Sequence, residues 1–119
     1  MKEQKREGSV VSCSSVESQD WYAWIDLMPP GPNHLHVMGE VQVPNPGVDP
    51  FLATKHPQGI NPSILLLDLH LVQRPGIWPD VVVWKQVRYD RIVHGAQYRQ
   101  VQVFCEEKMI ADMSVEIIS

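Results

Sequence analysis

The longest apolar run in the chain, residues 62–72, predicts an interior β-strand. Successive residues of a strand point to opposite sides of a sheet, so the run divides into two faces. One face is leucine at every position after the first, and the other is apolar except for Asp68 and His70. A helix is the alternative, because leucine favours helices. The prolines that flank the run and the strand-like segments around it favour a strand.

Five further segments alternate between apolar and polar positions, and this pattern predicts strands at residues 20–28, 34–43, 81–94, 98–105 and 109–118. Turn-forming residues separate these segments, and hairpins are expected at 29–33 and 106–108. Residues 44–61 are rich in proline and glycine. They predict a long irregular loop with one short helical turn at 49–52.

This spacing of strands and turns indicates an all-β protein. Six or seven short antiparallel strands are typical of a β-sandwich, with an immunoglobulin-like or similar Greek-key arrangement. An open β-barrel is the alternative. Residues 1–19 are charged and then rich in serine, and we expect them to form a flexible N-terminal tail. Residues 20–119 are expected to form a single β-sandwich domain.

Charge and cysteine content narrow the classes of function. The net charge is −4 and the lysines and arginines are scattered, so no basic face is expected for nucleic acid. Cys13 and Cys105 are expected to be two reduced thiols rather than a disulfide. No apolar segment is long enough for a signal peptide or a membrane span. We therefore expect a cytoplasmic protein with no membrane contact.

Two pairs of metal-ligating residues share one spacing. His34 and His36 leave the same face of one predicted strand, and Asp68 and His70 leave the same face of another. If these strands are neighbours, the four side chains converge, and they would suit zinc, iron or another first-row divalent metal. The simpler interpretation is that His34 and His36 face solvent. Asp68 and His70 would then pair with each other or with an arginine from a neighbouring strand.

The aromatic residues suggest surfaces for a partner. Trp84 is expected in the core. Trp78 lies in a proline-bounded turn, where it either packs under its own loop or contacts a partner. Trp21 and Trp24 lie on opposite faces of one strand, so an outward Trp24 predicts a subunit contact. Phe51 either pins the long loop to the body or binds a partner.

No motif in the sequence identifies an enzyme. The chain has no Gly-x-Ser-x-Gly nucleophile motif and no glycine-rich phosphate loop. We therefore expect a non-enzymatic binding or assembly module that needs no cofactor, binds a protein partner or associates with itself, and has an unidentified ligand. The alternative is a small metal-dependent or acid–base enzyme that uses the histidine and aspartate residues named above.

Overall fold

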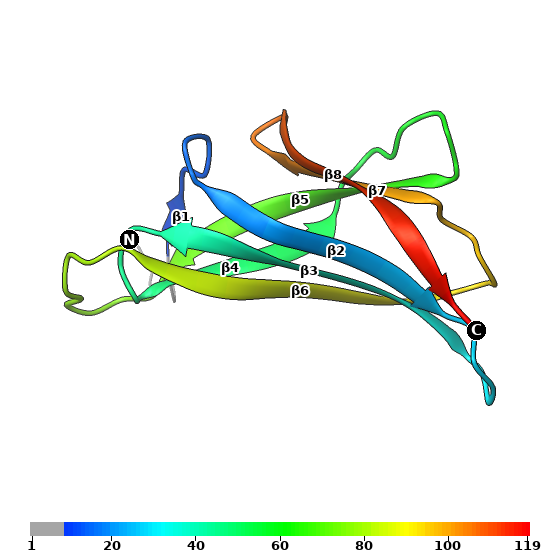
Figure 1. Ribbon diagram of the computed structural model, residues 1–119. Helices are drawn as coiled ribbons and strands as arrows, with labels where there is room; N and C mark the ends of the chain where they lie inside the picture. Colours follow the sequence, from blue (N-terminus) through cyan, green and yellow to red (C-terminus); the bar gives the residue numbers. More distant parts are fainter. Residues whose placement is uncertain (1–8) are drawn as a thin grey trace, which may run out of the picture.

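The computed structural model describes residues 9–119, and every regular element in this part of the chain is a β-strand (Figure 1). The expected all-β class is therefore confirmed. The strands are β1 (Ser9–Val11), β2 (Ser18–Asp26), β3 (Asn33–Val43), β4 (Val48–Thr54), β5 (Ile64–Gln73), β6 (Val83–Val93), β7 (Gln100–Cys105) and β8 (Lys108–Ile118). All six predicted strands form, with both ends within two residues of the predicted bounds.

The strands form one mixed sheet that curls into a half-barrel. Their hydrogen-bonded order is β1-β5-β7-β8-β2-β3-β6. Strand β4 lies outside this order and pairs with β5 alone. The pairs β5–β7 and β2–β8 are parallel, and the others are antiparallel. These two parallel pairs correct the expected purely antiparallel sandwich. The curled sheet is closer to the open barrel that we held as the alternative.

Strand β8 joins the two layers of the half-barrel. Its first part, residues 108–114, pairs with β7, and its last part, residues 115–118, pairs with β2. In Figure 1 it runs from the layer of β5 and β7 to the layer of β2, β3 and β6. Backbone hydrogen bonds therefore close the sheet continuously on this side.

On the opposite side, side chains rather than backbone bonds connect β4 to β6. The hydroxyls of Thr54 and Tyr89 lie 2.7 Å apart, and Lys85 Nζ lies 2.8 Å from Asp49 Oδ1. A hydrogen bond from Lys85 to Asp49 lowers the pKa of that carboxyl, with burial opposing the shift and Arg74 adding to it. The edges of β4 and β6 thus cover each other, which leaves little free edge for another strand.

Strand β4 was missed in the sequence. The long loop and the helical turn expected within it are wrong, because Val48–Thr54 pairs antiparallel with β5. Pro50 lacks an amide donor, and such a residue is tolerated in a strand when the strand lies at an edge. β4 has backbone pairing with β5 alone, so its proline breaks no ladder on the far side.

Residues 9–19 belong to the fold, which corrects the expected tail over this segment. β1 pairs antiparallel with the end of β5. Cys13 is buried and forms a disulfide with Cys105, at the end of β7, so the expectation of two reduced thiols is wrong. The bond joins positions 92 residues apart, and it ties the N-terminal segment to the body of the sheet. Residues 1–8 of the predicted tail lie outside the described residues.

The core lies between the two layers and consists of the inward residues of both. Its largest fully buried side chains include Leu65, Leu67 and Leu71 of β5, packed in one cluster with Leu35 and Val37 of β3. The apolar run that begins at residue 62 is therefore an interior strand, as predicted. No polar or charged residue of the described chain is buried.

Trp21 and Trp84 illustrate how register decides the side of the sheet. A bulge in β2 lets Trp21 lie over Gly39, where an added Cβ would come within 2.4 Å of the ring. The Trp21 ring therefore occupies the space that a side chain at position 39 would fill. Trp84 was expected in the core, but it points outward from β6 and is 42% exposed, because the buried positions Val87 and Val93 have the opposite parity.

Candidate functional site

The two predicted metal-ligand pairs lie on opposite outer surfaces of the protein. His34 and His36 point outward from β3, because their neighbours Leu35 and Val37 face the core. Asp68 and His70 point outward from β5 for the same reason, since the leucines between them face the core from the other layer. The two pairs therefore point away from each other.

This placement corrects the prediction of one shared metal site. In the sheet order, β7, β8 and β2 separate β5 from β3. Within residues 9–119, the one group of three ligand-type side chains close enough to share an ion consists of Cys13, Cys105 and Glu106. The prediction failed because it required β3 and β5 to be neighbours with matching faces.

Asp68 and His70 are not buried polar residues in need of a partner. His70 is exposed, and Asp68 is half-buried with Lys55 Nζ at 3.4 Å from its carboxylate. The same ammonium lies 2.9 Å from Glu107 and 5.2 Å from the ring centre of Phe104. The hydrogen bond to Glu107 raises the pKa of Lys55, with burial opposing the shift and Asp68 adding to it. This lysine, rather than an arginine, is the cation beside Asp68.

Four rings form a continuous row on the outer face of β2 and β3. The ring centres of Tyr22 and Trp24 lie 5.1 Å apart, those of Trp24 and His36 lie 4.9 Å apart, and those of His36 and His34 lie 5.9 Å apart. Trp24 and His36 are direct cross-strand partners, which brings the two strands' rings together. We call these four residues the ring row.

Charged side chains hold two members of the ring row, His36 in its interior and Tyr22 at one end. His36 Nδ1 lies 2.5 Å from Asp90 Oδ1, and because an ionised carboxylate can only accept, this nitrogen carries the proton. Arg88 Nε lies 3.0 Å from the second oxygen of Asp90. Burial raises the pKa of Asp90, but the hydrogen bonds from His36 and Arg88 outweigh it and the net shift is downward. The carboxylate therefore stays charged and fixes the orientation of the imidazole.

At one end of the row, the hydroxyl of Tyr22 donates a hydrogen bond to Glu116 of β8. This bond raises the pKa of the Tyr22 phenol, with burial and the charge of Glu116 adding to the effect. β3 therefore supplies two rings, β2 supplies two, and β6 and β8 supply the carboxylates. Four strands contribute to one outer surface, which we call the β2–β3–β6 face.

The predicted partner-binding residues lie in three different places. Trp24 is in the ring row and points outward from β2. Trp78 packs between its own loop, where its indole N–H donates to the carbonyl of Arg74 at 3.0 Å, and the β3–β4 loop, where its ring lies against Gly47. Phe51 points outward from β4 and is 53% exposed, opposite His70 in the neighbouring strand. Of the three, Trp24 alone lies among contacting rings.

Sequence reasoning missed four members of the β2–β3–β6 face, namely Tyr22, Arg88, Asp90 and Glu116. Tyr22 could have been found, because it shares the parity of Trp24. The other three lie far along the chain, and their contact with the rings depends on the pairing of β3 with β6 and of β2 with β8. No local pattern in the sequence encodes that pairing.

The comparisons with known proteins found no match to this chain. No protein-family model matches the chain, and no curated protein or solved structure matches it either. In the described part of the chain, no helix is long and apolar enough to cross a membrane. The functional inference therefore depends on the geometry of the residues themselves.

Proposed function

We propose that this protein is a non-enzymatic assembly module that associates with a second copy of itself through the β2–β3–β6 face. The observation that carries the proposal is the ring row, a set of contacting aromatic and imidazole rings on an open sheet surface. Tyr22 is 45% exposed, and the same face carries Trp84 at 42% and Ile92 at 60%. Aromatic residues gathered on a surface are the usual anchors of protein interfaces.

The polar groups of this face already have partners within the chain. Asp90 is bonded to His36 and Arg88, and Glu116 to Tyr22. Covering a charged group is costly mainly when that group is left unpaired. A partner could therefore cover this surface without supplying a matching charge for each residue.

A second copy fits the charge pattern of the face better than a strongly basic or acidic partner. Arg88 lies beside Asp90 on β6, so both signs occur within one small area. Two copies related by a two-fold axis can place the arginine of each near the carboxylates of the other, and two-fold dimers are the commonest homo-oligomers. Pairing through the sheet edges is less favourable, because β4 and β6 cover each other.

The metal-dependent or acid–base enzyme gains no support from the site geometry. Its four residues, His34, His36, Asp68 and His70, are divided between two surfaces.

The cytoplasmic location and the immunoglobulin-like or Greek-key arrangement stay predictions. Disulfides are rare in the cytosol, so the Cys13–Cys105 bond favours an oxidising compartment instead.

Sedimentation velocity over a range of protein concentrations tests the proposal. We expect the sedimentation coefficient to rise from that of a monomer to that of a dimer with increasing concentration. A monomer at every concentration would contradict self-association, and binding of the monomer to a different protein would assign the face to another partner.

A further inference from the structure

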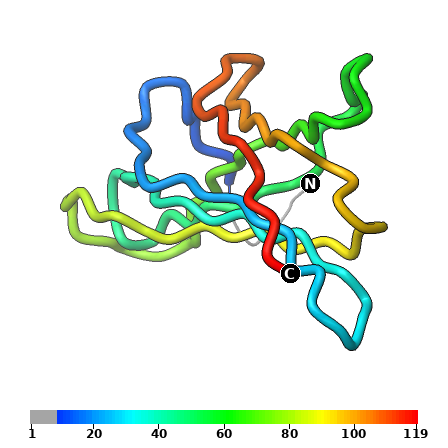
Figure 2. The backbone as a smooth tube through the Cα atoms, turned by 45° about the vertical axis from the view of Figure 1, so that its right-hand side comes forward, coloured from blue at the N-terminus to red at the C-terminus, as the bar shows by residue number. Residues whose placement is uncertain are grey.

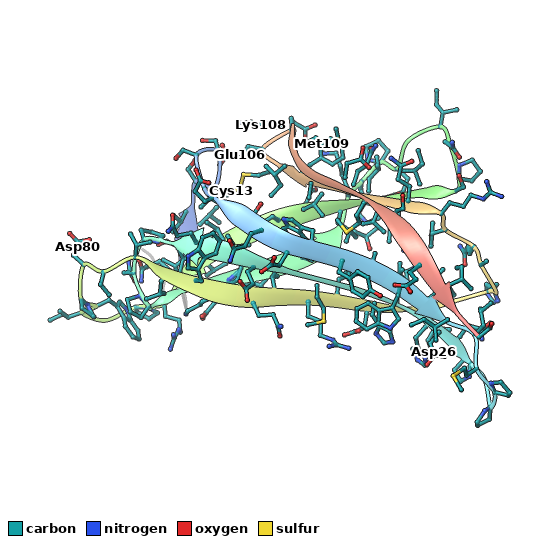
Figure 3. The ribbon with its side chains drawn as sticks, viewed as in Figure 1. Cys13, Asp26, Asp80, Glu106, Lys108 and Met109 are labelled. Atoms are coloured by element: carbon teal, nitrogen blue, oxygen red, sulfur yellow. A yellow bond between two sulfur atoms is a disulfide. The ribbon has the colours of Figure 1, made fainter. Side chains whose placement is uncertain are left out.

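Three metal-ligating side chains meet where the N-terminal segment crosses the β7–β8 hairpin. One ligand atom from each of Cys13, Cys105 and Glu106 lies within 4.8 Å of the other two. Cys13 is 3% exposed and Cys105 is fully buried, while Glu106 lies in the exposed turn. Figure 3 labels Cys13 and Glu106 close together, where the N-terminal segment approaches the β7–β8 turn.

The backbone of this cluster is held by contacts other than the sulfur–sulfur bond. The amide of Cys13 donates to Glu106 Oε2 at 3.3 Å, and its carbonyl accepts from Val16 at 3.2 Å. β1 fixes the preceding residues on β5, and Cys105 pairs with Lys108 across the hairpin. The Cα atoms of the two cysteines lie 5.9 Å apart in the disulfide-bonded structure. Because these other contacts remain, we expect the two cysteines to stay close when the bond between them is reduced.

The donor set suits zinc. Zinc binds thiolate sulfur at about 2.3 Å and carboxylate oxygen at about 2.0–2.2 Å, which in a tetrahedral site places donors about 3.3–3.8 Å apart. The two sulfurs are bonded to each other in the oxidised form, so they must move apart to this separation after reduction, while a Glu106 oxygen lies within 4.8 Å of both. A hollow of about 190 Å³ opens at the same place, lined by Cys13 and Glu106. It leaves room for a water molecule as the fourth ligand.

The surroundings of the hollow are more acidic than basic. Asp68, His70 and Glu107 also line it, and Lys55 is the cation paired with Glu107 and Asp68. A divalent cation is therefore favoured over an anion at this position.

We propose that the reduced form of this protein binds one zinc ion through Cys13, Cys105 and Glu106. A dithiol reductant supplies two electrons and two protons, so that the disulfide opens to two thiols and the reductant becomes a disulfide. Zinc then binds both sulfurs as thiolates, and the two thiol protons leave to solvent. The same two cysteines thus form either a covalent link or a metal site, according to the redox state. The inference does not depend on the proposed self-association.

Cobalt(II) is the probe, because thiolate ligands give it an intense near-ultraviolet charge-transfer absorption that oxygen and nitrogen ligands do not give. We expect the reduced protein to bind one Co²⁺ per chain with this absorption and the oxidised protein to bind none with it. Zn²⁺ should displace the bound cobalt. Glu106→Gln should weaken cobalt binding at least about tenfold, whereas Glu107→Gln, which removes a carboxylate that lines the hollow but is not in the ligand set, should weaken it less.

Thermal unfolding of the reduced protein supplies a second readout that detects whether the folded chain holds the ion. Binding to the folded state alone raises the unfolding temperature, so Zn²⁺ should raise that temperature for the wild type and not for the double variant Cys13→Ser, Cys105→Ser. The proposal is overturned by absence of the charge-transfer absorption in reduced protein. It is equally overturned by no rise in unfolding temperature, or by equal affinities of the Glu106→Gln and Glu107→Gln variants.

Discussion

The two outer surfaces of the half-barrel differ in what their aromatic residues contact. On the β2–β3–β6 face, Tyr22, Trp24 and the two histidines contact one another in the ring row. On the outer face of β4, β5 and β7, Phe104 lies under the ammonium of Lys55. Both surfaces belong to strands with the same alternation of apolar and polar residues, so alternation alone does not distinguish them.

The difference shows that a continuous row needs further rings along the same strands as well as one direct cross-strand pair. Trp24 meets a histidine ring because it lies directly opposite His36. Phe51 lies directly opposite His70 in the same way, but no ring stacking joins that pair in the described residues. Variants inside and outside the ring row test whether the ring row is the contact surface of the dimer. Figure 2 shows the loops at residues 29–33 and 74–82 projecting at opposite ends of the molecule.

Loss of the disulfide should have the largest effect on stability and should separate folding from association. The double variant Cys13→Ser, Cys105→Ser loses a link that closes a long loop, so the free energy of unfolding should fall by about 2–5 kcal/mol. Urea denaturation measures this change. Because both cysteines lie away from the ring row, the dimer dissociation constant of the folded variant should match that of the wild type. A large loss of association would mean that the N-terminal segment takes part in the interface.

Trp24→Ala should have the largest effect on association. Removal of a central aromatic anchor typically costs about 2 kcal/mol or more, so the dimer dissociation constant should rise about 30-fold. Phe51→Ala is the matched control, because Phe51 is an outward aromatic residue on the other face. Sedimentation equilibrium compares the two variants. Equal effects would remove the distinction between the faces.

Asp90→Asn should change the response of the β2–β3–β6 face to acid. The pKa of Asp90 is lowered in the folded protein, so its contribution to stability is fully present above the ordinary aspartate value of 3.8 and is lost as the pH falls through the folded value. When the pH is lowered below about 4, the free energy of unfolding should therefore fall less for the variant than for the wild type. Urea denaturation at several pH values measures this. Parallel losses in both proteins would contradict the role of Asp90.

Lys55→Met should have the smallest effect. Methionine retains an apolar chain beside Phe104 but removes the ammonium that contacts Asp68 and Glu107. Asp68 is 27% and Glu107 is 84% exposed, so neither becomes a buried unpaired charge when the ammonium is removed, and we expect a small decrease in the unfolding temperature and an unchanged dimer dissociation constant. Calorimetry and sedimentation measure the two quantities. A strong loss of association would move the interface to this face.

Local pattern was enough to predict six of the eight described strands but not the surfaces they build. The leucines of β5 and the alternation of β3 identified inward residues correctly, because period-two patterning is a property of each strand alone. β4 was missed because Pro50 and its neighbours resemble a loop until an edge position is known. The prediction that the histidine and aspartate side chains converge failed because convergence required a strand order that no single strand encodes.

The prediction of two reduced thiols failed for a related reason. Cys13 lies in a polar, serine-rich segment that resembles a tail, and Cys105 ends a strand far along the chain. Their contact follows from the pairing of β1 with β5 and of β5 with β7, which brings the two segments together. Composition alone favoured free thiols, and the three-dimensional arrangement reversed that expectation.

The most direct test of the central claim is to follow the backbone amide resonances of the protein as its concentration is raised. Self-association through the ring row predicts concentration-dependent shifts at outward residues of β2, β3 and β6, centred on Trp24 and His36. Shifts centred on β4 and β5, or no shifts up to the highest concentration, would contradict the claim.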